Sequence, residues 1–293
     1  MESSLRVSIV LPTYDGARYL RQSMDSCLSQ TYRNIELIVV DDGSSDETPQ
    51  IVGSYQDPRL QYTRHVRNKG LPGALNTGFD RAAGDYLTWT SDDNVFLPDA
   101  VEKMVRFAET GHHAFVFCDY YRFNGEDTSL GTVRVTLPDD PQLDKGNCIG
   151  YCFLYSRNVR DRVGDYDPNT RLAEDYDYWI RISKQFPLAH LNEPLYLTRF
   201  HDKSLYATRY SEVKVVDFLL RLKHGMLDTG QVAGLFIDLV ARKKRRLCRV
   251  RGAVAGLLIG TRVDGILRSF QVGQANLEAT KLRLQTILQR WPV

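Results

Sequence analysis

The chain has 293 residues, of which 43% are hydrophobic and 25% charged, so it is long enough for one large globular domain or for one domain with an appendage. This composition excludes disordered and collagen-like proteins, and five scattered cysteines without a CxxC pair argue against a disulfide scaffold or a zinc knuckle. Residues 241–293 carry 12 Lys and Arg against two acidic residues, a net charge of +10, which leaves −8 on residues 1–240. An acidic body with a basic end argues against nucleic acid as a partner and favours contact with an anionic surface such as membrane headgroups.

The N-terminal half alternates strands and helices in the pattern of βαβ units. Residues 7–12 form a short β-branched run ended by a proline, which is typical of a strand buried on both faces, and residues 17–30 have apolar side chains at helical spacing. The later expected elements are strand 35–40, a helix after the turn 41–46, strand 60–64, helix 72–83, strand 85–90, helix 98–109, strand 114–119, strand 149–155 and helix 173–186. This order predicts an α/β sheet with its polar strand ends at one edge, where ligands bind in such folds.

Beyond about residue 210 the apolar periodicity is wholly helical. We therefore expect one domain over residues 1–210 and a basic helical region over residues 211–293. The latter contains seven Lys and Arg within residues 241–251, and it either lies on an anionic membrane surface or packs on the sheet domain or on a second copy of the chain. The first apolar run is too short for a signal peptide, and no stretch reaches the ~18 apolar residues of a spanning helix. A cytoplasmic protein, soluble or peripheral on the inner face of the plasma membrane, is expected.

Phosphate-binding glycine motifs are absent from the sequence. There is no GxxxxGK[ST] and no GxGxxG, and the segment Gly70-Leu71-Pro72-Gly73 fits neither spacing. The expected strand ends carry carboxylates instead. This arrangement indicates that a hard divalent cation neutralises the phosphates of a ligand.

Two pairs of aspartates follow expected strands. Asp92 and Asp93 come directly after the strand 85–90, where one carboxylate can bind a metal and the other a ribose hydroxyl. The alternative is an acidic turn that caps the helix beginning near Pro98. Asp41 and Asp42 are either turn residues or acceptors for a nucleobase N–H.

A third carboxylate pair, Glu174 and Asp175, begins a helix that also carries Tyr178 and Trp179. A displacement at a sugar carbon needs one carboxylate to take a proton from the attacking hydroxyl, and desolvation beside aromatic rings raises a carboxyl pKa toward the useful range. Alternatively, the two acids only favour the helix dipole. His201 lies in a dense polar cluster and is either a ligand or phosphate contact or a structural histidine.

Together these residues resemble a known family over residues 5–210. The motifs Pro12-Thr13-Tyr14, Val39-Val40-Asp41-Asp42-Gly43-Ser44, Asn68-Lys69-Gly70, Thr90-Ser91-Asp92-Asp93-Asn94, Glu174-Asp175 and Arg199-Phe200-His201 occur in the order seen in family 2 glycosyltransferases of the GT-A fold. Each motif is weak alone, but six in register are specific. The segment from Ser91 to Asp99 looks most like the SpsA-type subgroup, which is linked to spore-coat and surface polysaccharides. The resemblance implies a Rossmann-like, mostly parallel sheet flanked by helices, with the C-terminal helices as an appendage.

The resemblance also implies roles for single residues. It implies nucleotide contacts by Pro12, Thr13, Tyr14, Asp42 (or Asp41) and Lys69, ribose contact by Asp92, Mg²⁺ or Mn²⁺ at Asp93, His201 near the diphosphate and the metal, and a general base at Asp175 or Glu174, with Asp175 favoured. The family's metal motif is often written D-x-D, and its first position here is Ser91. Family members of this kind invert the anomeric centre.

The implied activity is metal-dependent, inverting transfer of a sugar from a nucleoside diphosphate, with UDP favoured, to a hydroxyl of a surface glycan or lipid-linked acceptor. A sugar nucleotidyltransferase would need a glycine-rich, arginine-containing loop, and residues 13–18 supply one glycine. The non-enzymatic alternative is a degenerate glycan-binding or scaffold subunit of a polysaccharide assembly complex. The carboxylates at 92, 93, 174 and 175 argue against that alternative.

Overall fold

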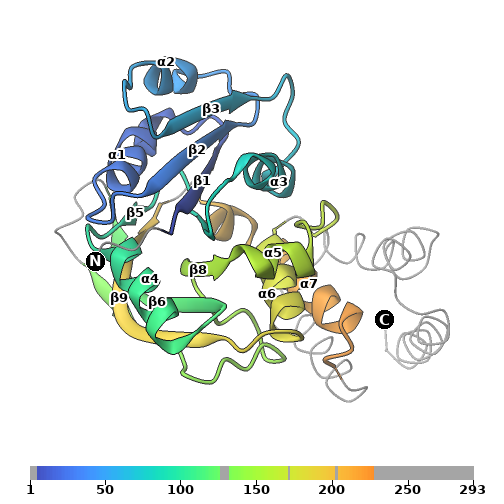
Figure 1. Ribbon diagram of the computed structural model, residues 1–293. Coiled ribbons are helices and arrows are strands. Elements are labelled where there is room, and N and C mark those ends of the chain that lie inside the picture. Colours follow the sequence, from blue (N-terminus) through green and yellow to red (C-terminus); the bar gives the residue numbers. More distant parts are fainter. Residues whose placement is uncertain (1–4, 126–131, 171, 202–203, 228–293) are drawn as a thin grey trace, which may run out of the picture. The chain divides into compact units, whose positions relative to one another are not determined.

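The computed structural model describes residues 5–125, 132–170, 172–201 and 204–227. Its centre is a nine-stranded sheet of order β3-β2-β1-β4-β8-β6-β9-β5, with β7 paired to β6 (Figure 1). The strands are β1 Val7–Thr13, β2 Ile35–Asp41, β3 Leu60–Arg64, β4 Tyr86–Trp89, β5 Val95–Phe96, β6 Phe115–Asn124, β7 Val133–Val135, β8 Cys152–Ser156 and β9 Ala189–Phe200. The helices are α1 Ala17–Leu28, α2 Thr48–Gly53, α3 Leu71–Arg81, α4 Ala100–Gly111, α5 Arg157–Val163, α6 Glu174–Ser183 and α7 Leu205–Lys223.

The sheet has a parallel half and a mixed half. Strands β3, β2, β1 and β4 are all parallel, so their carboxyl ends meet at one edge. Strand β8 runs antiparallel to both β4 and β6, while β9 is parallel to β6 and antiparallel to β5. The α/β architecture expected from the sequence is therefore present, with antiparallel pairs inserted after β4.

Helices cover both faces of the parallel half. One face of β1 packs in a core cluster that includes Leu20 and Met24 of α1. The other face meets α3, where a Cβ on Gly78 would lie only 2.3 Å from Val10 Cγ1. Strand β1 is buried along its whole length because each face is covered by a helical layer, as its continuous apolar run predicts.

An aromatic cluster fixes α6 against the mixed half of the sheet. The indole ring of Trp179 meets the rings of Phe115 and Phe153 edge-on, with centroids 5.2 and 4.5 Å apart. Tyr178 stacks on Tyr166 at 4.0 Å. These fully packed rings hold the first turn of α6, and the acidic residues on it, in a defined place.

Four short or irregular elements were not expected from the sequence, namely β5, β7, α5 and β9. The two-residue β5 and three-residue β7 are shorter than any periodicity can reveal. Strand β9 is only half-buried over its first six residues, contains Pro194, and shifts register twice against β6. Its pairing is set by tertiary contacts that no local pattern announces.

The C-terminal region is described only in part. Helix α7 continues the helical pattern expected after residue 210, and contacts divide the chain into the compact units Met1–Asp217 and Phe218–Val293. Residues 228–293, with the basic stretch 241–251, lie outside the described residues, so the boundary at 210 stays a prediction. Among the helices that are described, none has the length and apolar character to cross a bilayer.

Candidate active site

The polar residues predicted to bind a ligand gather at the carboxyl edge of the parallel strands. Thr13 at the end of β1 is in register with Asp41 at the end of β2, and β4 on the other side of β1 leads into Asp92 and Asp93. The backbone N–H of Asp42 donates to the carbonyl of Thr13 at 2.8 Å. The structure thus brings together the predicted residues of the first half of the chain.

Asp41 is fully buried and its carboxylate is occupied by the chain's own donors. Its Oδ1 accepts from the backbone N–H groups of Gly43 and Ser44, at 3.1 and 2.7 Å. Its Oδ2 accepts from the Tyr62 hydroxyl at 2.8 Å and lies 3.2 Å from Arg64 Nε. A carboxylate offers about four acceptor positions, so these donors use them all.

Asp42 ties the end of β2 to the loop before α3. Its Oδ1 accepts from the Lys69 backbone N–H at 2.8 Å and lies 2.6 Å from His65 Nδ1. Its Oδ2 accepts one hydrogen bond from a described residue, the backbone N–H of Gly70 at 2.8 Å. Gly70 has φ +81°, a backbone conformation that glycine adopts without strain. The Lys69 side chain is exposed beside this loop, as is the ring of Tyr14 at the end of β1.

Asp92 is held in a tight polar corner. The Thr13 hydroxyl donates to Asp92 Oδ2 at 2.6 Å, and Gly16 leaves the space for it, because a Cβ on Gly16 would lie 1.9 Å from that oxygen. Burial, followed by the charge of neighbouring Asp93, raises the pKa of Asp92 to about 7. Sequence reasoning missed Gly16, since a single glycine after a strand gives no specific signal.

Asp93 and His201 come together from distant parts of the chain. Asp93 Oδ2 lies 3.0 Å from His201 Nε2, while Asp93 Oδ1 is buried and has no hydrogen-bond partner among the described residues. A buried carboxylate oxygen without a donor is costly unless a cation or a ligand group completes its coordination. A carboxylate oxygen suits both Mg²⁺ and Mn²⁺, whereas an imidazole nitrogen is a softer donor that suits Mn²⁺ better than Mg²⁺, so this pair fits the predicted metal best as Mn²⁺.

The protein's own donor set for a metal is small. In the part of the chain that is described, no group of three or more His, Cys, Asp or Glu side chains is placed to hold an ion. Two side chains cannot fill the octahedral shell of Mg²⁺ alone. Such shells are completed by water and substrate phosphates in many nucleotide-dependent enzymes, which matches a metal that arrives with its nucleotide.

Arg199 at the end of β9 fixes the backbone around this pair. The side-chain Nε of Arg199 donates to the backbone carbonyl of Asp93 at 2.9 Å, and the backbone N–H of Arg199 donates to Asn94 Oδ1 at 2.9 Å. The guanidinium lies over the rings of Tyr19 and Phe123, 4.0 and 4.6 Å from their centroids. Sequence analysis included Arg199 in a motif but gave it no role. The available signal was an arginine that follows the apolar run Leu195-Tyr196-Leu197 and stands two residues before His201.

The third carboxylate pair lies at the start of α6. Asp175 Oδ1 accepts from the Tyr176 backbone N–H at 2.7 Å, and its Oδ2 accepts from Asn147 Nδ2 at 2.9 Å. Burial raises the pKa of Asp175 above its ordinary value, which favours a group able to take up a proton. Glu174 is more buried than Asp175, with 6% of its surface exposed. Trp179 and Tyr178 anchor the helix in the aromatic core.

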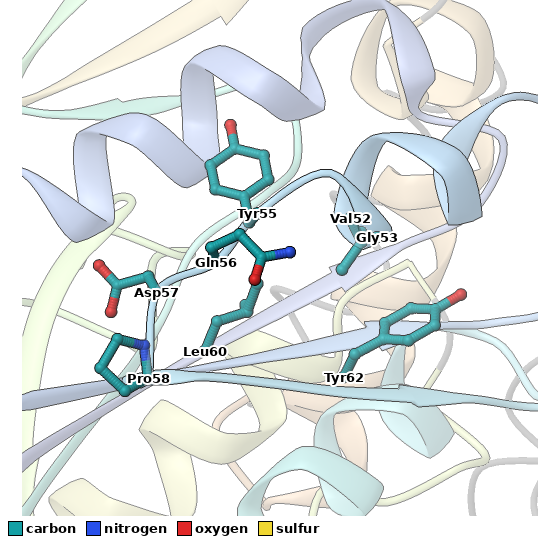
Figure 2. Close-up of a pocket in the computed structure, with 8 residues that line it drawn as sticks. All are labelled: Val52, Gly53, Tyr55, Gln56, Asp57, Pro58, Leu60 and Tyr62. Atoms are coloured by element: carbon teal, nitrogen blue, oxygen red, sulfur yellow. The ribbon is translucent and has the colours of Figure 1, made fainter.

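A hollow of about 380 Å³ lies elsewhere, on the segment from α2 to β3 (Figure 2). Residues from Val52 to Tyr62 line it, and none of the predicted site residues does. Figure 2 shows the rings of Tyr55 and Tyr62 on separate sides of this hollow. Its link to the strand ends is the Tyr62 hydroxyl, which donates to buried Asp41. The chemistry-bearing carboxylates are therefore not in this hollow.

Residues 8–164 match the family model described as Glycosyl transferase family 2. An uncharacterized glycosyltransferase of Rickettsia typhi is 30% identical over 226 residues, which are 73% of this chain and 70% of that protein. Another, of Rickettsia prowazekii, is 33% identical, with 67% of this chain and 64% of that protein covered. In three further Rickettsia relatives the matched region is 34% of the protein or less.

An Escherichia coli protein named UDP-Glc:alpha-D-GlcNAc-diphosphoundecaprenol beta-1,3-glucosyltransferase WfaP is 29% identical over 71% of this chain and 82% of its own length. Among solved structures, Staphylococcus aureus TarS with UDP-GlcNAc is similar at TM-score 0.62 and 16% identity, over 91% of this chain and 80% of that one. The mannosyltransferase PcManGT of Pyrobaculum calidifontis, with GDP-Man and Mn²⁺, is similar at TM-score 0.59 and 15% identity, over 96% and 88%. The GT-A fold implied by the sequence motifs is confirmed.

Proposed function

The chain belongs to glycosyl transferase family 2, and on that premise we propose that it transfers a sugar, with inversion and with a divalent cation, from a nucleoside diphosphate to a hydroxyl of a surface glycan or lipid-linked acceptor. The observation that carries the proposal is the buried Oδ1 of Asp93 beside His201. This oxygen has no hydrogen-bond partner in the described part of the chain and lies at the carboxyl edge of the parallel strands of a GT-A fold. These two side chains would hold Mn²⁺ or Mg²⁺. When bound, the cation stabilises the charge that develops on the departing diphosphate.

We propose that the nucleoside lies over the ends of β1 and β2. The exposed ring of Tyr14 offers a stacking surface after Pro12, and Asp42 Oδ2 keeps acceptor capacity for a base N–H. Asp41 is the weaker candidate because its acceptor positions are filled. Asp92, held by Thr13, faces the ribose in this arrangement, and Lys69 lies near the phosphates.

UDP is the favoured nucleotide. Relatives and neighbours named for UDP-Glc, UDP and UDP-GlcNAc support it, and the neighbour bound to GDP-Man makes GDP the second choice. The name of the Escherichia coli relative, which acts on a diphosphoundecaprenol-linked acceptor, supports a lipid-linked acceptor.

Asp175 acts as the base in this proposal. Its carboxylate takes the proton of the acceptor hydroxyl as that oxygen bonds to the anomeric carbon, and the bond from this carbon to the diphosphate breaks. A single displacement of this kind inverts the anomeric centre. The raised pKa of Asp175, which burial causes, suits the transfer.

Nucleotide recognition is testable by thermal unfolding with UDP-Glc, UDP-GlcNAc and GDP-Man, each with and without Mn²⁺. We expect a UDP-sugar to raise the midpoint more when Mn²⁺ is present, because a ligand that binds only the native state stabilises it. In Asp93→Ala the Mn²⁺-dependent part of the shift should vanish. It should persist in the control Asp161→Ala, which changes an exposed aspartate of α5. Equal shifts with and without Mn²⁺ in the wild type would contradict the metal site.

We also propose that the basic segment 241–293 holds the protein at the inner face of the plasma membrane. Seven Lys and Arg within residues 241–251 support this proposal, since each cation near an anionic surface contributes ~1 kcal/mol. A lipid-linked acceptor would make such contact useful.

A further inference from the structure

The segment between β7 and β8 carries Asn147, whose side chain reaches the first turn of α6. Asn147 Nδ2 donates to Asp175 Oδ2 at 2.9 Å. We infer that Asn147 is a positioning residue, which fixes the carboxylate of Asp175 for proton transfer from the acceptor hydroxyl. This inference rests on the proposed role of Asp175 as the base, and it adds a residue on the acceptor side that the family motifs did not include.

The orientation of the Asn147 amide is set by the chain itself. Its Oδ1 accepts from the backbone N–H of Ile149 at 3.4 Å, so the amino group is left to face Asp175. On either side of Asn147, the side chains of Leu143 and Ile149 are buried, and the Tyr176 hydroxyl of α6 donates to the carbonyl of Leu143. The segment is thus anchored before and after the exposed amide, and one anchor is on the helix that carries Asp175.

Two glycines shape the segment around Asn147. Gly146 has φ +147° and Gly150 has φ +72°, backbone conformations that residues with a side chain rarely adopt. A Cβ on Gly150 would also lie 3.0 Å from Tyr120 Cε1. The backbone path is therefore specialised for this conformation, and its result is to place an amide donor at the carboxylate of Asp175.

The hydrogen bonds leave the carboxylate ready to act. The Tyr176 N–H donates to Oδ1 and the Asn147 amide donates to Oδ2, which fixes the plane of the group. Among the described residues, these two donors leave the carboxylate with acceptor capacity for a substrate hydroxyl. Burial and the negative charge of Asp217 on α7 raise the pKa of Asp175, while the Asn147 amide opposes this rise. Tyr166 is a further titratable group that feels the charge of Asp175.

The inference is tested by the pH dependence of kcat in the full chain with Mn²⁺ and the UDP-sugar that supports turnover. Asn147→Ala should lower kcat at neutral pH about tenfold to a hundredfold, leave KM for the UDP-sugar within about twofold, and move the acid limb to higher pH, because the charged base has lost a donor. Asn147→Gln, which keeps an amide donor, should restore part of the rate. Asn169→Ala is the matched control, since it removes an exposed amide that donates to Asp167 at 2.9 Å, and it should change nothing.

A second measurement separates this inference from the proposed base. Because Asn147 acts through Asp175, adding Asn147→Ala to Asp175→Asn should cause no further loss of kcat. An unmoved acid limb in Asn147→Ala, or an equal loss in the Asp175→Asn background, overturns the role of Asn147 while Asp175 stands. Wild-type kcat in Asp175→Asn overturns the base itself. An unchanged unfolding midpoint in Asn147→Ala excludes misfolding as the cause of its loss.

Discussion

At the scale of single residues, the site depends on how closely polar atoms approach one another. Asp92 lies 2.6 Å from the Thr13 hydroxyl because Gly16 has no side chain, and Asp93 keeps one buried oxygen without a donor among the described residues. The hydrogen bond from Thr13 is favourable, but the desolvation of the Asp92 carboxylate and of the Asp93 oxygen raises the free energy of the folded protein. Such costs are retained where ligand binding requires them. Both aspartates are therefore better placed for a ligand than for stability.

Gly16→Ala is expected to weaken nucleotide binding more than it weakens the fold. The new Cβ would lie 1.9 Å from Asp92 Oδ2 and 2.6 Å from Thr13 Oγ1, so the carboxylate has to leave its place. We expect the Kd for UDP, measured calorimetrically with Mn²⁺, to rise about tenfold, a loss of about 1.4 kcal/mol. Gly53→Ala is the control, because a Cβ there has no neighbour within 4 Å. Unchanged UDP affinity in Gly16→Ala would show that Asp92 does not contact the nucleotide.

Asp175→Asn is expected to lower kcat about 10²–10⁴-fold, while the Kd for the nucleotide sugar stays within about twofold, because the base acts in the transition state. The base works only when deprotonated, and burial raises its pKa. In the wild type, kcat should therefore fall on acidification at a pH above the ~3.9 of an ordinary aspartate. Kinetics of Asp175→Asn and Glu174→Gln decide between the two acids. Loss in Glu174→Gln alone would move the role to Glu174, and full activity in both variants would place the base elsewhere.

Sequence patterns predicted these residues unevenly. Asp41 and Asp42 are adjacent and chemically identical in the sequence. Yet the acceptor positions of the Asp41 carboxylate are filled by Tyr62, Arg64 and two backbone donors, and only the folded chain reveals this difference. The pairing of Asp93 with His201 was suggested by the family motifs. The contact between Asn147 and Asp175 spans 28 residues and had no motif to announce it.

At the scale of secondary structure, the carboxyl ends of the parallel strands are held in place by helices that pack very closely on the sheet. Helix α3 packs against β1 and β2 through Gly78, where a Cβ would lie 2.3 Å from Val10 Cγ1 and 3.2 Å from Val40 Cγ2. The parallel half was predictable because continuous apolar runs mark its strands. Strand β9 was not predictable, because a half-buried strand with a proline has no clear local pattern. This strand places Arg199, and His201 directly after it, at the site.

Gly78→Ala should lower the free energy of unfolding by about 1–3 kcal/mol, since a methyl group forced into a packed interface shifts the helix away from the sheet. In a helix without a close neighbour, the same substitution would raise the free energy of unfolding by roughly 0.5–1 kcal/mol. The sign of the change in this free energy therefore shows whether α3 approaches the sheet closely. Urea denaturation of Gly78→Ala beside Gly53→Ala gives the comparison. A variant as stable as Gly53→Ala would mean that α3 does not approach β1 as closely as described.

At the scale of the whole molecule, the chain is divided by charge. Residues 1–240 carry −8 and residues 241–293 carry +10, which places an acidic catalytic body and a basic segment on one protein. Composition alone shows this division. The acidic part also contains the proposed nucleotide-sugar site, where a divalent cation would offset the combined charge of the carboxylates and the diphosphate.

The basic segment is expected to bind anionic membranes through its charge. Full-length protein should co-sediment with phosphatidylglycerol-containing vesicles at low salt, and binding should fall at high salt, because screening weakens attraction between exposed charges. Deleting residues 241–293 should abolish co-sedimentation without changing the unfolding midpoint of the remainder. Absence of binding at every salt concentration, with a lower oligomeric mass after the deletion, would make the segment a subunit interface instead.

The most direct test of metal-dependent sugar transfer is the release of UDP from UDP-Glc and UDP-GlcNAc, with water taking the sugar in place of the acceptor hydroxyl. Full-length protein treated with EDTA is assayed with and without added Mn²⁺. The wild type and Asp161→Ala should release UDP only when Mn²⁺ is returned, whereas Asp93→Ala should stay inactive at the same Mn²⁺ concentration, because the unpartnered Oδ1 of Asp93 beside His201 is the predicted cation site. Mn²⁺-stimulated release by Asp93→Ala would contradict that site. Binding of UDP-sugars without any release by the wild type would contradict the transferase activity and leave a glycan-binding or scaffold subunit.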